Sequence, residues 1–182
     1  MTMYHDPILW QEGQQLLGEE IKAFFNDSTI DSVQVLRQAL SVERLDSIHY
    51  NQITGNEMHT YFRDGEVYLS TSIGNVYVNY FHMGEDSILA DMNRTETTFL
   101  KIFLKDRKVD KIWMPAATGS FYPIPLIPAD MLYVENFAWF DYVRPVDKHD
   151  IFEWRPKKAG SELKKITRRE APKQKLSNIK KK

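Results

Sequence analysis

The sequence contains no cysteine, which excludes disulfide bonds, thiolate metal sites and cysteine nucleophiles at the same time. Glycine is sparse, with 8 in 182 residues, and no glycine-rich loop of the kind that binds phosphate occurs. No run approaches the roughly 18 consecutive apolar residues that a membrane-spanning helix needs. Residues 1–10 lack the basic segment and apolar stretch of a secretory signal. This leaves open a cytosolic protein and a fragment or mature form of an exported one.

The composition instead describes a soluble globular protein, with 42% apolar, 13% aromatic and 27% charged residues. The net charge of -1 hides a strong asymmetry along the chain. Residues 1–154 carry 12 Lys and Arg against 23 Asp and Glu, a net charge of -11. Residues 155–182 carry 12 against 2, a net charge of +10. We therefore expect two parts, an acidic body (1–154) and a basic tail (155–182).

One segment of the body occurs three times with different residues. The sequence LGEEIKAFFND (17–27) returns as TGNEMHTYFRD (54–64) and more loosely as ETTFLKIFLKD (96–106). The copies are offset by 37 and then 42 residues. A unit of this length cannot bury its own apolar face, so the copies are expected to stack on one another.

Within each copy the apolar residues alternate, as in a strand with one buried face. The nine positions predicted to share this face and form a ladder are Ile21, Ala23, Phe25, Met58, Thr60, Phe62, Leu100, Ile102 and Leu104. Each copy then reaches a polar turn, at Asp27, Asp64 and Asp106, and continues as a second strand. In the first two copies a kink and a third short strand follow, at 39–42 and 76–80. No window before residue 145 sustains a helical period. The prediction is an all-β fold.

The chain changes character after Pro115, where several prolines interrupt an apolar segment. We expect a loop packed against the sheet there, followed by a final strand or edge cover in the aromatic stretch 136–143. Asp147 is a suitable N-cap for one short helical turn. The tail is expected to form short helices or to be disordered.

Motifs for catalysis or metal binding are missing. The five histidines form no HExxH motif, and no GxSxG occurs. His49 and His59, expected on neighbouring strands, fit ordinary surface residues better than ligands. Glu20 and Glu57 occupy equivalent repeat positions and are expected to face solvent rather than to form a catalytic pair. The turn aspartates suit turn geometry better than calcium binding. We therefore predict no enzymatic activity, no metal and no cofactor.

Several segments resemble one family. PILW (7–10), LGEEI (17–21), Asp27 and QITGNEM (52–58) with Asp64 resemble the OstA-like (organic solvent tolerance) repeats of lipopolysaccharide-transport proteins. IFLKDRKV (102–109) and ENFAWFDY (135–142) with Arg144 and Pro145 are similar to the C-terminal part of Bacteroidetes-type OstA-like proteins. The likeness covers nearly the whole chain. Because the chain starts within a repeat, we expect it to be amino-terminally incomplete.

The resemblance implies an open β-jellyroll of stacked antiparallel strand pairs, whose apolar interior shields the acyl chains of lipopolysaccharide in the periplasm or at the outer membrane. The partners it implies are this or a similar amphipathic lipid, other jellyroll subunits at the edge strands and an outer-membrane transport partner. The residues to which we assign lipid contact are Ile21, Phe25, Met58, Phe62, Leu100, Ile102 and Leu104.

Three other functions remain open. The first is a structural or protein-interaction scaffold without a lipid ligand, and the second is a polysaccharide-active enzyme on a β-stack. The third is an anionic-polymer binder that uses the tail. For the tail itself an anionic surface or partner is expected over nucleic acid, since aromatic residues are absent beyond Trp154.

Overall fold

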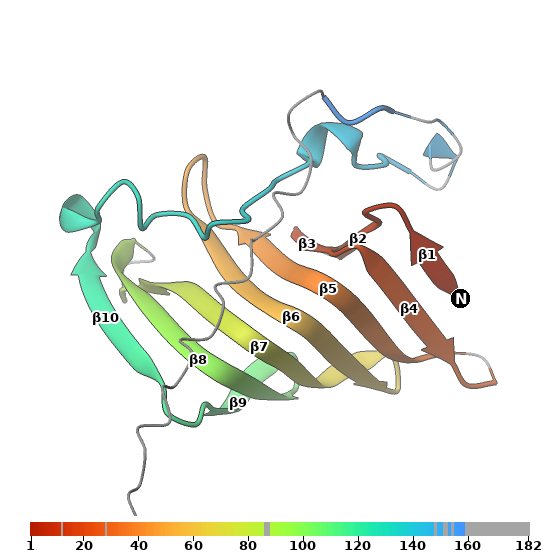
Figure 1. Ribbon diagram of the computed structural model, residues 1–182, viewed down its shortest axis with the longest axis horizontal. Helices are drawn as coiled ribbons and strands as arrows, with labels where there is room; N and C mark the ends of the chain where they lie inside the picture. Colours follow the sequence, from red (N-terminus) through yellow and green to blue (C-terminus); the bar gives the residue numbers. More distant parts are fainter. Residues whose placement is uncertain are drawn as a thin grey trace, which may run out of the picture.

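The computed structural model describes residues 1–11, 13–27, 29–85, 88–147, 149–150, 153 and 155–158. Within these residues the protein is all-β, an open antiparallel sheet of ten strands that does not close into a barrel (Figure 1). The strands are β1 (Thr2–Tyr4), β2 (Ile8–Gln11), β3 (Gln14–Leu17), β4 (Glu20–Phe25), β5 (Ile30–Arg44), β6 (Tyr50–Arg63), β7 (Glu66–Met83), β8 (Leu89–Lys105), β9 (Lys108–Trp113) and β10 (Thr118–Pro123). The main path runs β1-β4-β5-β6-β7-β8-β10, with β3 on β5, β2 on β3 and β9 on β8.

The sequence repeat corresponds to a β-hairpin. The first strands of the three copies are β4, β6 and β8, and the second strands are β5, β7 and β9. Asp64 and Asp106 occupy the turns with positive φ values of 53° and 51°. This left-handed conformation is one that Asp tolerates better than most residues, so backbone geometry explains its recurrence at the turns.

Each repeat also bends at the same level. Positive φ values occur at Arg37 and Gln38, and again 37 residues later at Gly74 and Asn75. The strand register shifts at these positions, because the extra residues form β-bulges. The third copy has its positive φ at Ala116, 42 residues after Gly74. The predicted kinks are therefore confirmed, and they line up as a bend that crosses the sheet.

The bend places apolar side chains from both halves of the sheet in one cluster. The inner face is defined here as the face that carries the buried residues Ile21, Ala23, Val33, Val35, Ala39 and Met58. Leu16 and Ile53, from the other side of the bend, pack against them. The sheet therefore folds toward this face, and the opposite face is called outer.

Residues 128–145, called the strap, cover the outer face on the β3 side of the bend. Val134 and Phe140 from the strap are buried together with Leu17, Leu40 and Val42 from the sheet. In Figure 1 the strap runs along the ends of the strands at the top of the view. It contributes no strand, so the prediction of a final strand or edge cover at 136–143 is wrong. The aromatic residues pack onto a face of the sheet instead.

Side-chain amides on the sheet hold the strap by its backbone. Gln15 donates from Nε2 to the Ala138 carbonyl at 2.9 Å and accepts the Phe140 N–H at 2.8 Å. Gln52 makes the same pair of bonds with Leu132 (2.9 Å) and Val134 (2.8 Å). Farther along the same row, Asn79 and Arg94 donate to the carbonyl of Met131. These polar side chains replace the hydrogen bonds that a neighbouring strand would supply.

Two other sequence expectations concern the C-terminal half. The proline-rich stretch after Pro115 was expected to be a loop, but residues 118–123 form β10, which pairs with β8. Pro123 is tolerated there because it ends the strand.

Asp147 does accept N–H groups of His149 and Asp150, as a helix cap would. The predicted helices of the tail lie outside the described residues. The described residues include no helix long and apolar enough to cross a membrane.

Candidate functional site

The inner face carries three cross-strand rows between the bend and the turns. The first row, next to the bend, consists of Ile21, Val35, Met58, Ser72 and Leu100. The second consists of Ala23, Val33, Thr60, Ser70, Ile102 and Ile112. The third, next to the turns, consists of Phe25, Ile30, Phe62, Val67, Leu104 and Val109. Equivalent positions of the three copies lie in one row, so the ladder inferred from the repeat is present.

Exposure increases from the bend toward the turns. Ile21, Met58 and Leu100 in the first row are between 0% and 4% exposed. In the third row Phe25 is 59% exposed and Val109 is 57% exposed. The first row is therefore a filled floor, and the third row is an apolar rim that is open to a ligand.

This gradient divides the seven residues assigned to lipid contact. Ile21, Met58 and Leu100 belong to the floor. Phe25 is exposed, and Phe62, Ile102 and Leu104 are half-buried, so these four present accessible apolar surface. Lipid contact at all seven positions stays a prediction.

The second strand of each hairpin contributes apolar residues that the sequence assignment left out. Val35, Val67, Val109 and Ile112 lie in the same rows as the assigned residues. The alternating pattern of these strands was visible, but which of their faces joins the ladder depends on the register across the turn. A one-residue shift of that register would have put them on the outer face.

Charged groups lie beside the apolar rim at the turns. Arg107 donates from Nε to Glu66 at 2.9 Å and so links the β8–β9 turn to the β6–β7 hairpin. The Arg63 guanidinium lies 4.5 Å from the centre of the Tyr68 ring. A shallow hollow between these turns is lined by Arg63, Asp64, Glu66, Val67, Tyr68, Leu104 and Asp106. The rim is therefore amphipathic, with apolar side chains on the inner face and charges at its margin.

The carboxylates of Glu20 and Glu57 do not form a pair. Both align with Leu36 on β5, which lies between their strands. Glu20 is only 7% exposed, so the expectation that it faces solvent is wrong. Burial opposes its ionisation, but hydrogen bonds from Lys22 and Arg37 outweigh this effect and lower the pKa of its carboxyl. The group is held as a carboxylate in an ion-pair network.

The histidines also have separate partners. The expectation that His49 and His59 lie on neighbouring strands is wrong. His49 directly precedes β6, and His59 lies within β6. His49 Nδ1 lies 2.7 Å from Asp46 Oδ2, and His59 Nε2 lies 3.4 Å from Glu57 Oε2. In the described part of the chain no three His, Asp or Glu side chains are grouped to hold a metal ion.

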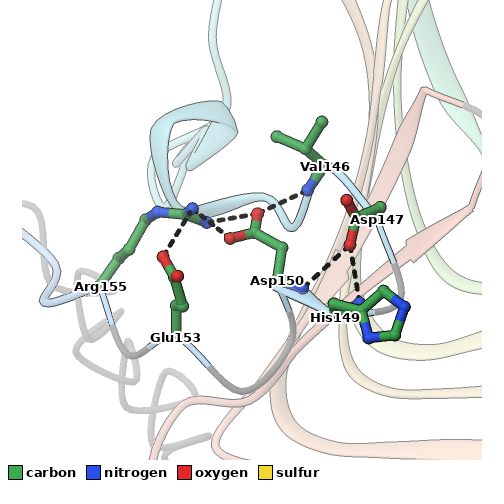
Figure 2. Close-up of polar contacts among 6 residues, drawn as sticks. All are labelled: Val146, Asp147, His149, Asp150, Glu153 and Arg155. Atoms are coloured by element: carbon green, nitrogen blue, oxygen red, sulfur yellow. Dashed lines mark hydrogen bonds and ion pairs between the residues drawn. The ribbon is translucent and has the colours of Figure 1, made fainter.

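A polar cluster lies near the end of the described chain (Figure 2). Arg155 donates to both carboxylate oxygens of Asp150, and Asp150 also accepts the Val146 N–H at 2.7 Å. The hydrogen bond from Arg155 is the main reason that the pKa of the Asp150 carboxyl is lowered. These groups satisfy one another, so the cluster fastens the segment after the strap rather than presenting a reactive group.

Comparison with protein-family models, with curated proteins and with solved structures found no match for this chain.

Proposed function

We propose that this protein is a non-enzymatic lipid-transport module that shields the acyl chains of lipopolysaccharide, or a similar amphipathic lipid, against its inner face. The observation that supports the proposal is the accessible apolar rim, in which each of the three hairpins contributes an apolar pair next to its turn: Phe25 with Ile30, Phe62 with Val67 and Leu104 with Val109. An open sheet can contact a lipid along its side, whereas a closed pocket would have to enclose it.

The physical basis of the proposal is the burial of methylene groups. Each buried methylene contributes about 0.8 kcal/mol, so an acyl chain lying along several rim residues would gain several kcal/mol. Arg63 and Arg107 at the margin of the rim lie where the polar part of the same lipid would remain in water. The chain's own turns therefore offer both environments that an amphipathic molecule needs.

The proposal includes partners and a location. Unpaired backbone groups lie on β1 at one side of the described sheet and on β9 and β10 at the other. Such edges can pair with a strand of another jellyroll subunit or of an outer-membrane transport partner. The proposed place of action is the periplasm, in association with the outer membrane.

A scaffold without a lipid ligand is the second candidate, and the filled floor favours it. Val35 and Ala39 are 0% exposed, as in an ordinary core. If the rim only extends this core, a protein partner rather than a lipid would cover it.

Photo-crosslinking distinguishes the two candidates. We expect p-benzoylphenylalanine at Phe25, Phe62 or Ile102 to label lipopolysaccharide when the full chain is irradiated with the lipid. Phe24 is the matched control, because it is 44% exposed, adjacent to Phe25 and directed to the outer face.

Labelling at Phe24 equal to that at Phe25 would show adsorption without a specific face. An absence of labelling at all four positions would favour the scaffold. Only strong labelling confined to the inner face agrees with the transport proposal.

A further inference from the structure

The β8–β9 hairpin presents two different surfaces. On the inner face its residues are aliphatic: Leu100, Ile102, Leu104, Val109 and Ile112. On the outer face every residue is aromatic or lysine: Phe99, Lys101, Phe103 and Lys105 on β8, and Lys108, Lys111 and Trp113 on β9. The register pairs Lys101 with Trp113, Phe103 with Lys111 and Lys105 with Lys108, which places these six on one side, and Phe99 joins them because it lies two residues before Lys101 on β8.

The outer-face residues form one continuous surface. The rings of Phe99 and Trp113 meet edge to face with centroids 5.5 Å apart. Lys101 Nζ lies 5.9 Å from the centre of the Phe99 ring. The surface continues onto β7 through Leu69 and Ile73, which pair with Phe103 and Phe99.

This surface is uncovered in the described chain. Every residue of β9 is exposed, and Trp113 is 49% exposed. The strap packs on the outer face only on the other side of the bend, where Gln15, Gln52 and Asn79 hold it. The outer face near the turns therefore displays apolar rings that no described segment shields.

The charge of this surface is opposite to that of the body as a whole. Residues 1–154 carry a net charge of -11, yet 5 of their 12 Lys and Arg lie within residues 101–111. Four of these five are the outer-face lysines, while the fifth, Arg107, is paired with Glu66. The acids of the same hairpin, Asp106 and Asp110, lie in the turn and at the register shift rather than in the lysine rows.

We propose that the outer face of the β8–β9 hairpin docks on the surface of an anionic lipid bilayer. Lysines attract anionic headgroups, and Trp and Phe rings insert at the level between headgroups and acyl chains. A bilayer fits better than a nucleic acid, because the cations of this face are lysines rather than the arginines that bind phosphates bidentately, and because aliphatic Leu69 and Ile73 extend the patch. Docking uses the outer face, whereas the proposed shielding of acyl chains uses the inner face, so docking does not depend on the proposed function.

The absence of cysteine allows a direct test with matched reporters. Ile112 and Trp113 are adjacent and 50% and 49% exposed, but they lie on opposite faces. Each is replaced by cysteine in the full chain (Ile112→Cys, Trp113→Cys) and labelled with the polarity-sensitive dye NBD. Vesicles of phosphatidylcholine with phosphatidylglycerol are expected to shift the emission of the dye to the blue at position 113, whereas a shift at position 112 reports lipid contact of the inner face. Lys111→Cys provides a second outer-face reporter that retains Trp113.

A charge variant tests the role of the lysines. Each basic residue near an anionic surface contributes roughly a fivefold gain in affinity, so replacing Lys101, Lys105, Lys108 and Lys111 by Gln is expected to weaken vesicle binding by at least about tenfold. The matched control replaces four tail lysines (Lys173, Lys175, Lys180 and Lys181) by Gln. It is expected to retain the dye response at position 113.

Three results would overturn the proposal. The first is the absence of a dye response at 113, and the second is undiminished binding by the hairpin lysine variant when its thermal unfolding matches that of the parent. The third is a stronger response at 113 to a single-stranded oligonucleotide than to vesicles, which would assign this face to nucleic acid. If photo-crosslinking fails to label lipid from the inner face, the dye response at 113 is unaffected, because Trp113 lies on the outer face.

Discussion

Gly18 and Gly55 occupy equivalent positions in the first two repeats, and both are buried beside a neighbouring strand. A Cβ atom at Gly18 would collide with the Val35 side chain, and one at Gly55 would collide with the Ser72 hydroxyl. That hydroxyl donates to the Thr54 carbonyl at 2.8 Å, so it cannot move freely. The repeat thus preserves glycine where the strands approach closely at the bend.

Gly18→Ala and Gly55→Ala are each expected to lower the free energy of unfolding by about 1–3 kcal/mol, because the added methyl group overpacks the bend. Urea denaturation measures the change, with Thr98→Ala on the exposed side of β8 as the control. In the third copy the equivalent residue is Thr97, whose hydroxyl donates to the Pro115 carbonyl at 2.8 Å. A loss at Gly55 no larger than that at Thr98 would contradict this view of the bend.

Asp46 stabilises the turn between β5 and β6 through its charge. Its carboxylate accepts the N–H groups of Ile48 and His49 and contacts the His49 ring. Burial raises the pKa of this carboxyl, but the hydrogen bonds from the His49 ring and the two backbone groups outweigh burial and lower the pKa to about 2. The ordinary value is 3.8.

Because the folded-state pKa is below the unfolded value, the stabilisation is fully present above about pH 4 and is lost as the pH falls through about 2. Asp46→Asn is expected to be less stable than the parent by about 0.5–1 kcal/mol at pH 6, a small effect since the side chain is 45% exposed. Denaturant unfolding at several pH values should show the two proteins converging toward pH 2. A constant difference across this range would exclude an electrostatic contribution from this carboxylate.

At the level of elements, the strap depends on the sheet beneath it for its backbone hydrogen bonds. Gln15 and Gln52 each satisfy one N–H and one carbonyl of the strap, and both are 0% exposed. A buried backbone group left without a partner costs about 1–3 kcal/mol. Aromatic packing alone therefore does not account for the position of this segment.

Gln52→Leu leaves the Val134 N–H without its sheet partner and the Leu132 carbonyl with only the 3.3 Å hydrogen bond from Asn79, and it is expected to destabilise the protein by about 1–3 kcal/mol. The loss should be local, so hydrogen exchange would accelerate in the strap before it does in β5 and β6. Gln34→Leu is the control, because Gln34 lies on the other side of the bend from the strap. Unchanged exchange in the strap of the Gln52 variant would show that apolar packing suffices to hold it.

At the level of the whole molecule, the bend and the strap give the two faces different roles. The inner face is filled next to the bend and becomes exposed toward the turns, where Phe25 and Val109 form the open rim. The outer face is covered by the strap on one side of the bend and uncovered on the other. Both proposed contacts with lipid therefore lie in the half of the sheet that ends in the hairpin turns.

Much of this architecture was predictable from the sequence, because it depends on local alternation and on repetition. The 37- and 42-residue offsets predicted that Ile21, Met58 and Leu100 would share a row, and they do. The second-strand members of the rows were missed, because the register of each hairpin decides which of their faces is inward. The burial of Glu20 was missed as well, since its partner Arg37 extends from a bulge on the next strand.

The sequence by itself determined the all-β class, the hairpin repeat, the turns and the kinks, since each depends on residues that are close along the chain. Only the tertiary structure decided the direction of the bend, the face covered by the strap and the part of the apolar ladder that remains open. These features depend on contacts between distant segments, such as Gln15 with Ala138, which are 123 residues apart. An alternating pattern shows that a strand has an apolar face. Which segment packs against that face depends on the contacts of the whole fold, because the native packing is the one in which all segments are compatible.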